Sequence, residues 1–295
     1  MPLALPRLKT SLRILAVAAL TFALNGCVNL DDAAGLSKLS EHARLALPRV
    51  SNDVAATCAR QNTLLANTPA GERPPSIQPQ DCKPYQELAR HLALDQHILV
   101  GYFDALGKLS SNKPMSYAED IHDNEVATSK SDAFSANAIT ASNDAQSILK
   151  SLADAVTKGY REKQLGEFIQ ANDPAIQSLT QALKKVITVD YALLLSNEEL
   201  SLDAFYQAPM ASSQSGERLA LILVQRQYAN DKTALQSRKD AILSYGRIMD
   251  DIGSLHAKLK QQAGRKVSMI DIAKEIGPTV ASLQNAISDL QSRSN

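Results

Sequence analysis

Apolar residues recur at intervals of three and four along most of the chain, a spacing that places side chains on one face of an α-helix. The pattern predicts helices over residues 36–65, 85–109, 139–160, 176–200, 219–259 and 272–290. If residues 216–264 are unbroken, they form a helix of about 45 residues and about 68 Å. No alternating Val- and Thr-rich run suggests a strand. Because helices with one apolar stripe must pack lengthwise, we expect an all-α fold, an elongated, mostly antiparallel bundle of about five or six long helices.

Proline residues suggest where these helices begin, bend or end. Pro48 and Pro278 lie inside apolar patterns, so each marks either a kink or a break between two helices. Asp173 and Pro174 fit the cap and the first residue of a new helix. Pro209 fits the end of that helix, because a polar turn-forming cluster follows it.

The first 27 residues carry a targeting pattern. Residues 1–13 contain basic but no acidic side chains, and the apolar run that follows, residues 14–24, is too short for a membrane-spanning helix, which needs about 20 residues. Leu24, Asn25, Gly26 and Cys27 resemble the lipobox of bacterial lipoproteins, although Asn25 departs from the usual small or hydroxyl residue.

This resemblance implies a signal peptide over residues 1–26, a lipidated tether over residues 27–35 and a helical bundle domain over residues 36–295. Cys27 would carry a diacylglyceryl group on sulfur and an acyl chain, such as palmitate, on its amino group; several chains together give stable anchoring. Val28 is not the Asp that retains enterobacterial lipoproteins in the inner membrane, so we expect an outer-membrane anchor that faces the periplasm. The alternative is an ordinary secreted protein in which Cys27 is incidental.

Composition narrows the function classes. The chain has 31 basic and 31 acidic residues, and three of the basic ones lie in residues 1–26, so residues 27–295 carry 28 against 31, a net charge of −3. This balance gives no basic surface for nucleic acid. Trp is absent, and only 13 residues are aromatic, 8 Tyr and 5 Phe. This composition favours packing between helices.

Two cysteines remain once Cys27 is lipidated. Cys58 and Cys82 form an even pair, which in an oxidising compartment predicts a disulfide; two buried free thiols are the alternative. The cysteines flank a Pro-rich loop over residues 67–81 that cannot be helical. The loop is either a connector held closed by the disulfide or an arm that binds a partner.

Candidate chemistry is sparse. Glu119 and His122 form a single Glu-x-x-His pair, whereas di-iron bundles need two such pairs and two further glutamates. Glu87, His91 and Asp95 are spaced by four and share one helix stripe, which either holds an ion or is a solvated polar face. No hydrolase or phosphate-loop motif is present. The sequence therefore predicts no catalytic residue, no cofactor and no metal.

Three charged residues interrupt the apolar seams of the predicted helices. Asp95, Asp190 and Arg226 occupy seam positions, where an unpaired charge would be costly, so pairs between an Asp and the Arg of another helix would set the register of the bundle. The alternative is that these side chains face water.

Long helices and a lipid anchor without a chemical site point to interaction rather than catalysis. We expect a lipid-anchored periplasmic scaffold, secretion-system accessory or immunity-type protein that binds a protein partner in the envelope and contacts the membrane through Cys27. One alternative is a binder of peptidoglycan, lipid or another envelope ligand. Another is an envelope hydrolase whose site gathers residues from distant helices.

Overall fold

A computed structural model describes residues 31–110, 135–160, 164–212, 217–263 and 269–293. The described chain is helical throughout apart from short connections, and no strand occurs in these ranges. Its elements are α2 (Asp31–Asn67), the short 3-10 helix η1 (Ala70–Glu72), α3 (Lys83–Ser110), α4 (Ala136–Thr157), α5 (Leu165–Lys185), the π-helix η4 (Val186–Tyr191), α6 (Ala192–Ser212), α7 (Arg218–Ala263) and α8 (Met269–Arg293). Since α5, η4 and α6 follow one another directly, the described elements form six long rods, and the predicted all-α bundle is confirmed.

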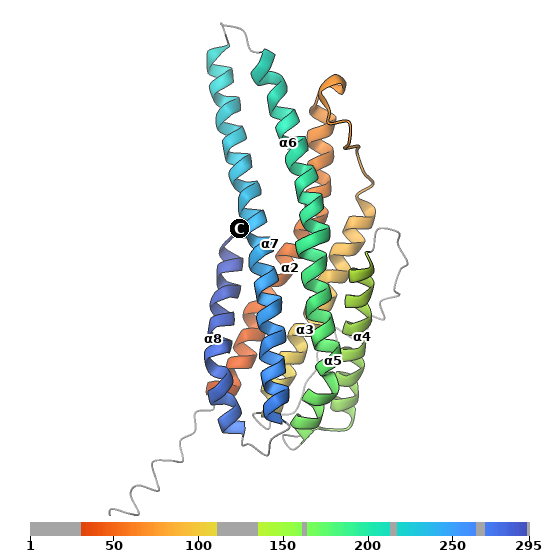
Figure 1. The fold of residues 1–295 in the computed structure, drawn as a ribbon, viewed down its shortest axis with the longest axis vertical. Coiled ribbons are helices and arrows are strands. Elements are labelled where there is room, and N and C mark those ends of the chain that lie inside the picture. The colour runs from red at the N-terminus through yellow and green to blue at the C-terminus, as the bar shows by residue number, and fades with distance from the viewer. Residues whose placement is uncertain (1–30, 111–134, 161–163, 213–216, 264–268, 294–295) are drawn as a thin grey trace, which may run out of the picture.

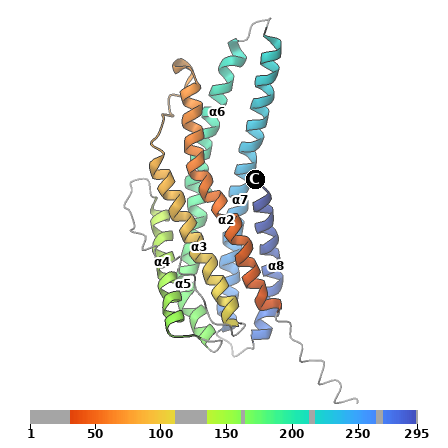
Figure 2. The same ribbon diagram turned by 180° about the vertical axis from the view of Figure 1, so that it is seen from behind.

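The rods lie side by side in an elongated bundle (Figure 1). In the lower half of this view α2 packs on α3 and α8, α4 packs on α3 and α5, and α7 packs on α5 and α8. The upper half is thinner, because α4 and α8 do not reach it; it holds α6, the first half of α7, the end of α2, η1 and the start of α3 (Figures 1 and 2). α2 begins at the lower end, and α6 and α7 are joined at the opposite, upper end.

The predicted helix faces form the core. Buried side chains follow the three-four spacing along α3, as at Leu88, Leu92, Leu99 and Leu106, and comparable stripes line the inner faces of the other rods. α7 is a single helix of 46 residues, so the structure decides the continuity of residues 216–264 that the sequence left open.

Proline does not break the helices where the sequence suggested. α2 runs through Pro48 and α8 runs through Pro278, so neither helix is divided into two. The expected helix start at Asp173 and Pro174 is wrong, because both residues lie inside α5. The expected stop at Pro209 is also early, since α6 continues to Ser212. Long-range packing of both flanking turns outweighs the local cost of a missing donor.

The first helix also begins earlier than its apolar pattern. α2 starts at Asp31, so the part of the predicted 27–35 tether that the structure describes is helical. Leu36 is the first residue of the core cluster, and Gly35 lies against Val280 of α8. The lipobox residues Leu24, Asn25, Gly26 and Cys27 lie outside the described residues.

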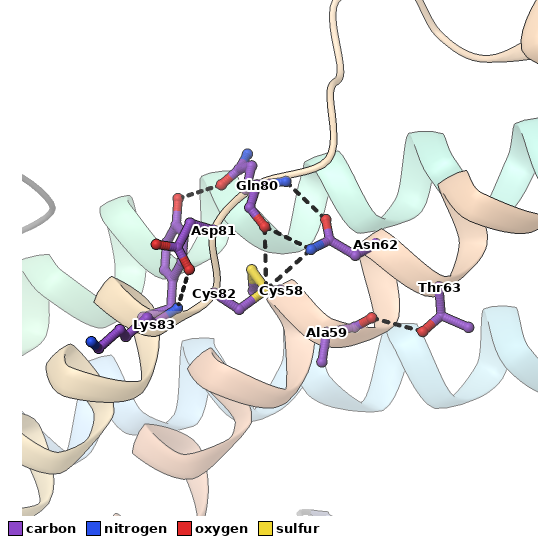
Figure 3. Close-up of a disulfide and its surroundings, with 9 residues drawn as sticks. Cys58, Ala59, Asn62, Thr63, Gln80, Asp81, Cys82 and Lys83 are labelled. Atoms are coloured by element: carbon purple, nitrogen blue, oxygen red, sulfur yellow. Dashed lines mark hydrogen bonds between the residues drawn. A yellow bond between two sulfur atoms is a disulfide. The ribbon is translucent and has the colours of Figure 1, made fainter.

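Cys58 and Cys82 form the predicted disulfide, with 5.7 Å between their Cα atoms. It links the interior of α2 to the residue before α3 and closes the Pro-rich loop (Figure 3). The side chain of Asn62 reinforces this link, because its Nδ2 donates to the carbonyl of Gln80 at 2.7 Å and its Oδ1 accepts from the amide of Gln80 at 3.0 Å. The free thiols considered as an alternative are therefore excluded.

Candidate functional site

A hollow of about 780 Å³ opens between α2 and α7 at mid-height in the bundle. We call it the α2–α7 hollow; its lining residues are Arg49, Val50, Asn52, Asp53, Ala56, Tyr191, Ala234, Ser237, Arg238, Ala241 and Ser292. α8 packs against both α2 and α7 in the lower half and ends about halfway along α7 (Figures 1 and 2). The hollow therefore continues the track that α8 occupies.

Small side chains make the hollow, and the end of α8 closes it. Ala56 on α2 and Ala234 and Ser237 on α7 leave space that larger side chains would fill. At the lower end, the guanidinium of Arg49 donates to the carbonyl of Gln291 at 3.3 Å, in the last turn of α8. A cation at a helix C-terminus satisfies carbonyls that have no partner within the helix.

Four charged side chains on three helices form a neutral cluster beside the hollow. Glu198 of α6 accepts from Arg60 Nε of α2 at 2.8 Å and from both terminal nitrogens of Arg238 of α7 at 2.6 and 2.9 Å. A second carboxylate, Asp53, accepts from Arg60 at 2.8 Å and lies 4.0 Å from Arg238. Glu198 is only 3% exposed, so both of its oxygens depend on these two guanidiniums. Two acids and two bases leave no net charge.

The π-helix η4 brings Tyr191 into this cluster. Its hydroxyl donates to Asp53 and lies 3.3 Å from the hydroxyl of Thr57, and burial together with the Asp53 carboxylate raises the pKa of Tyr191 far above its ordinary value. A π-helical turn inserts an extra residue and so changes which side chains of the following helix face the bundle. In an uninterrupted α-helix, the side chain of Glu198 would be rotated away from Arg60 and Arg238. The apolar spacing across residues 176–200 gave no indication of this turn.

A relay that resembles a catalytic triad is also present, in the core. Tyr102 lies 2.7 Å from Nε2 of His256, whose Nδ1 lies 3.1 Å from Asp173, and Lys260 donates to the same carboxylate at 2.6 Å. Burial lowers the pKa of His256, so the neutral ring is favoured. Tyr102 and His256 are fully buried, and the ring of Tyr102 stacks on Phe168. None of these residues lines the hollow, and we assign the relay to the packing of α3, α5 and α7.

The structure does not gather the metal-ligand candidates into a site. His91 and Asp95 are each 3% exposed, so the solvated face that was the alternative reading of this stripe is wrong for both. Glu87 instead pairs with Arg90 at 3.5 Å. Within the described ranges no three His, Cys, Asp or Glu side chains are placed to hold an ion. Glu119 and His122 lie outside the described residues.

The predicted register-setting pairs are wrong. Arg226 is exposed to solvent, so it cannot neutralise a buried carboxylate. Asp95 is buried and faces a second acid, Asp144; burial first, and then this neighbour, raise the pKa of Asp95. Oδ2 of Asp190 is buried without a hydrogen-bond partner among the described residues. The buried carboxylate that does form ion pairs between helices is Glu198, with Arg60 and Arg238.

The first turns of α7, at the upper end of the bundle, expose large apolar side chains. Leu219, Ile222 and Leu223 are 72%, 51% and 58% exposed, and we call them the apolar end of α7. They belong to an unbroken apolar run, residues 219–224, whose members point in every direction around the helix axis. α6 can cover only one side of such a helix. A helix that is apolar all round is normally enclosed by other elements.

None of the helices within the described ranges is long and apolar enough to cross a membrane. Comparison of the chain with protein-family models gives no match, and comparisons with curated proteins and with solved structures give none either. The geometry of the hollow and of the apolar end is therefore the basis for assigning a function.

Proposed function

We propose that this protein is a lipid-anchored component of the bacterial envelope that binds another protein through the upper half of its bundle. The observation that carries the proposal is the pairing of two features there, the α2–α7 hollow and the apolar end of α7. Exposed apolar residues bounded by polar surface are typical of protein interaction sites. A groove between helices is a common receptor for an amphipathic helix.

The lipobox resemblance at Leu24 to Cys27 supports the anchoring half of the proposal. α2 begins at Asp31, four residues after Cys27, at the lower end of the bundle (Figure 1). The hollow and the apolar end lie above it, and α7 alone is about 69 Å long at 1.5 Å per residue. A lipid on Cys27 would thus hold the interaction surface away from the membrane. With Val28 after the cysteine, we propose the periplasmic face of the outer membrane.

Fractionation of cells that express the Cys27→Ser variant tests the anchor. The wild-type chain should sediment with membranes, and the variant should be released or retained as a precursor while its helical circular dichroism is unchanged. A variant that carries the same lipid-dependent membrane attachment as the wild type would show that Cys27 is not the anchor.

Affinity capture from envelope extracts tests the interaction half. The wild-type chain should retain a partner in stoichiometric amounts, and replacement of Leu219, Ile222 and Leu223 by Ser should abolish retention. The matched control replaces Val189, Leu193 and Leu243 by Ser; these side chains are also 58%, 66% and 63% exposed but lie outside the apolar end. Equal retention by both triple variants would contradict the proposed surface.

A second candidate function is the binding of a small envelope ligand in the hollow itself. The observation that favours it is the volume of about 780 Å³, which falls within the range of small-molecule sites, about 300–1,000 Å³. Mass spectrometry of the purified protein would detect a bound lipid or muropeptide, and Ser237→Phe should displace it.

A further inference from the structure

One stripe of α7 carries large exposed side chains in the first turns and small side chains that line the hollow further along. Leu219 and Ser237 are 18 positions apart, as are Leu223 and Ala241, and 18 residues correspond to about five full turns. The two leucines therefore stand on the same stripe of α7 as the residues that line the hollow. Asn230, which is exposed, lies on this stripe midway between the leucines and the lining residues.

This arrangement is self-complementary. The protruding side chains Leu219 and Leu223 are 72% and 58% exposed, and the recess begins about 17 Å beyond Leu223 along the same helix, where Ala234 and Ser237 line the hollow. If a second α7 lies antiparallel beside the first, the leucines of each copy meet the recess of the other. A surface that fits itself in this way forms a closed two-fold dimer.

We propose that two copies of this chain pair antiparallel through the first halves of their α7 helices. This inference rests on the interaction surface of the proposed function, and in it the bound partner is a second copy of the same chain. In the register that fits, Leu223 faces Ser237 of the other copy, Leu219 faces Ala241, and the two Asn230 side chains meet at the two-fold axis. Each apolar end then fills the other copy's hollow.

Among the residues that the structure describes, no helix lies in the upper half of the bundle at the position that the second copy would occupy. There α2 and α7 flank the line that α8 follows in the lower half. α8 runs antiparallel to α7 (Figure 1). An antiparallel α7 from a second copy would therefore continue the line of α8 with the same direction. Its N-terminus would meet the C-terminus of α8, a favourable head-to-tail alignment of helix dipoles.

The charges and the size of the surface agree with this pairing. Arg238 already binds Glu198, so the hollow can accept leucine without leaving a free charge beside it. Asn230 is uncharged, so no like charges meet on the axis itself, and the exposed Arg226, one turn away, would face Ala234 of the other copy. The contact would run for about 36 Å along α7 and, with a helix width of about 10 Å on both the α2 and α7 walls, cover about 700 Å² per copy, close to the roughly 800 Å² of standard interfaces.

Crosslinking and mass measurement test the pairing on the full chain. Light scattering during gel filtration should give twice the mass of one chain. In a Cys27→Ser background, Asn230→Cys should form a disulfide-linked dimer on mild oxidation. Gln225→Cys is the matched control, because Gln225 is also exposed but lies on the other side of α7, and it should remain uncrosslinked.

Substitutions on the two complementary parts should weaken the dimer separately. Leu223→Ser removes the protruding side chain and Ser237→Leu fills the recess; each should raise the dissociation constant by at least about tenfold with unchanged helix content. A monomeric wild-type chain overturns the pairing, whether it binds phospholipid vesicles or captures a different protein instead. Capture of a different protein by that monomer would leave the proposed function standing. A dimer that crosslinks through Gln225→Cys and not through Asn230→Cys also overturns it.

Discussion

Replacement of Glu198 by Gln is expected to lower the free energy of unfolding by about 2–3 kcal/mol. The carboxylate is 3% exposed and receives hydrogen bonds from Arg60 and Arg238. Removal of one partner of a buried ion pair costs about 3–5 kcal/mol, because the remaining charge stays in the interior. The Arg60 and Arg238 side chains are 38% and 20% exposed, so water regains part of their solvation and reduces the cost.

Urea unfolding followed by circular dichroism measures this cost, with an unchanged slope against urea concentration as the sign that the unfolded state is unaffected. Glu199→Gln is the matched control. Glu199 follows Glu198 directly and also binds two cations, Lys232 at 2.7 Å and Lys239 at 2.5 Å, but its side chain is 27% exposed. Glu199→Gln should lower the free energy of unfolding by less than about 1 kcal/mol. Equal losses for the two variants, within about 0.5 kcal/mol, would refute the reasoning that burial sets the cost.

Three further predictions concern the stability of the fold. Replacement of Cys58 and Cys82 by Ala opens a loop with a sequence separation of 24 and should cost about 3 kcal/mol, measured by thermal unfolding with the reduced wild type as comparison. Burial lowers the pKa of His256 below 6.5, so as the pH falls the unfolded chain takes up this proton before the folded chain does. The contribution of His256 to the free energy of unfolding is therefore fully present above about pH 6.5 and is lost as the pH falls through the pKa of the folded state. His256→Gln should flatten this pH dependence of the melting temperature. Gly246→Ala should destabilise the protein although Ala favours helix, because the added Cβ would lie 2.9 Å from Thr188; a rise in melting temperature would contradict this close packing.

The helical content of the fold could be predicted because it depends on local spacing. Apolar residues at intervals of three and four placed Leu88, Leu92 and Leu99 on one face of α3, and that face is buried. The apolar spacing over residues 219–259 predicted helix there, but the continuity of α7 through Gly246 and Gly253 was decided only by the structure. The disulfide followed from the cysteine count and the proline-rich loop between Cys58 and Cys82.

The ends of helices were predicted less well, because packing competes with local preference there. Asp173 and Pro174 have the chemistry of a helix start, yet the carboxylate of Asp173 binds His256 and Lys260 of α7 from inside α5. These contacts join residues 83 and 87 positions apart, and no local pattern contains them.

The sequence alone determined that the chain is helical, which faces are apolar and which cysteines pair, since each depends on composition and short-range spacing. Only the tertiary structure decided which charges meet. Arg60, Glu198 and Arg238 come from three helices, and the π-helix that turns α6 toward them leaves no trace in the apolar spacing. The hollow likewise appears only when the rods are packed together, because its walls combine small side chains of α2 and α7 with Tyr191 and the last turn of α8.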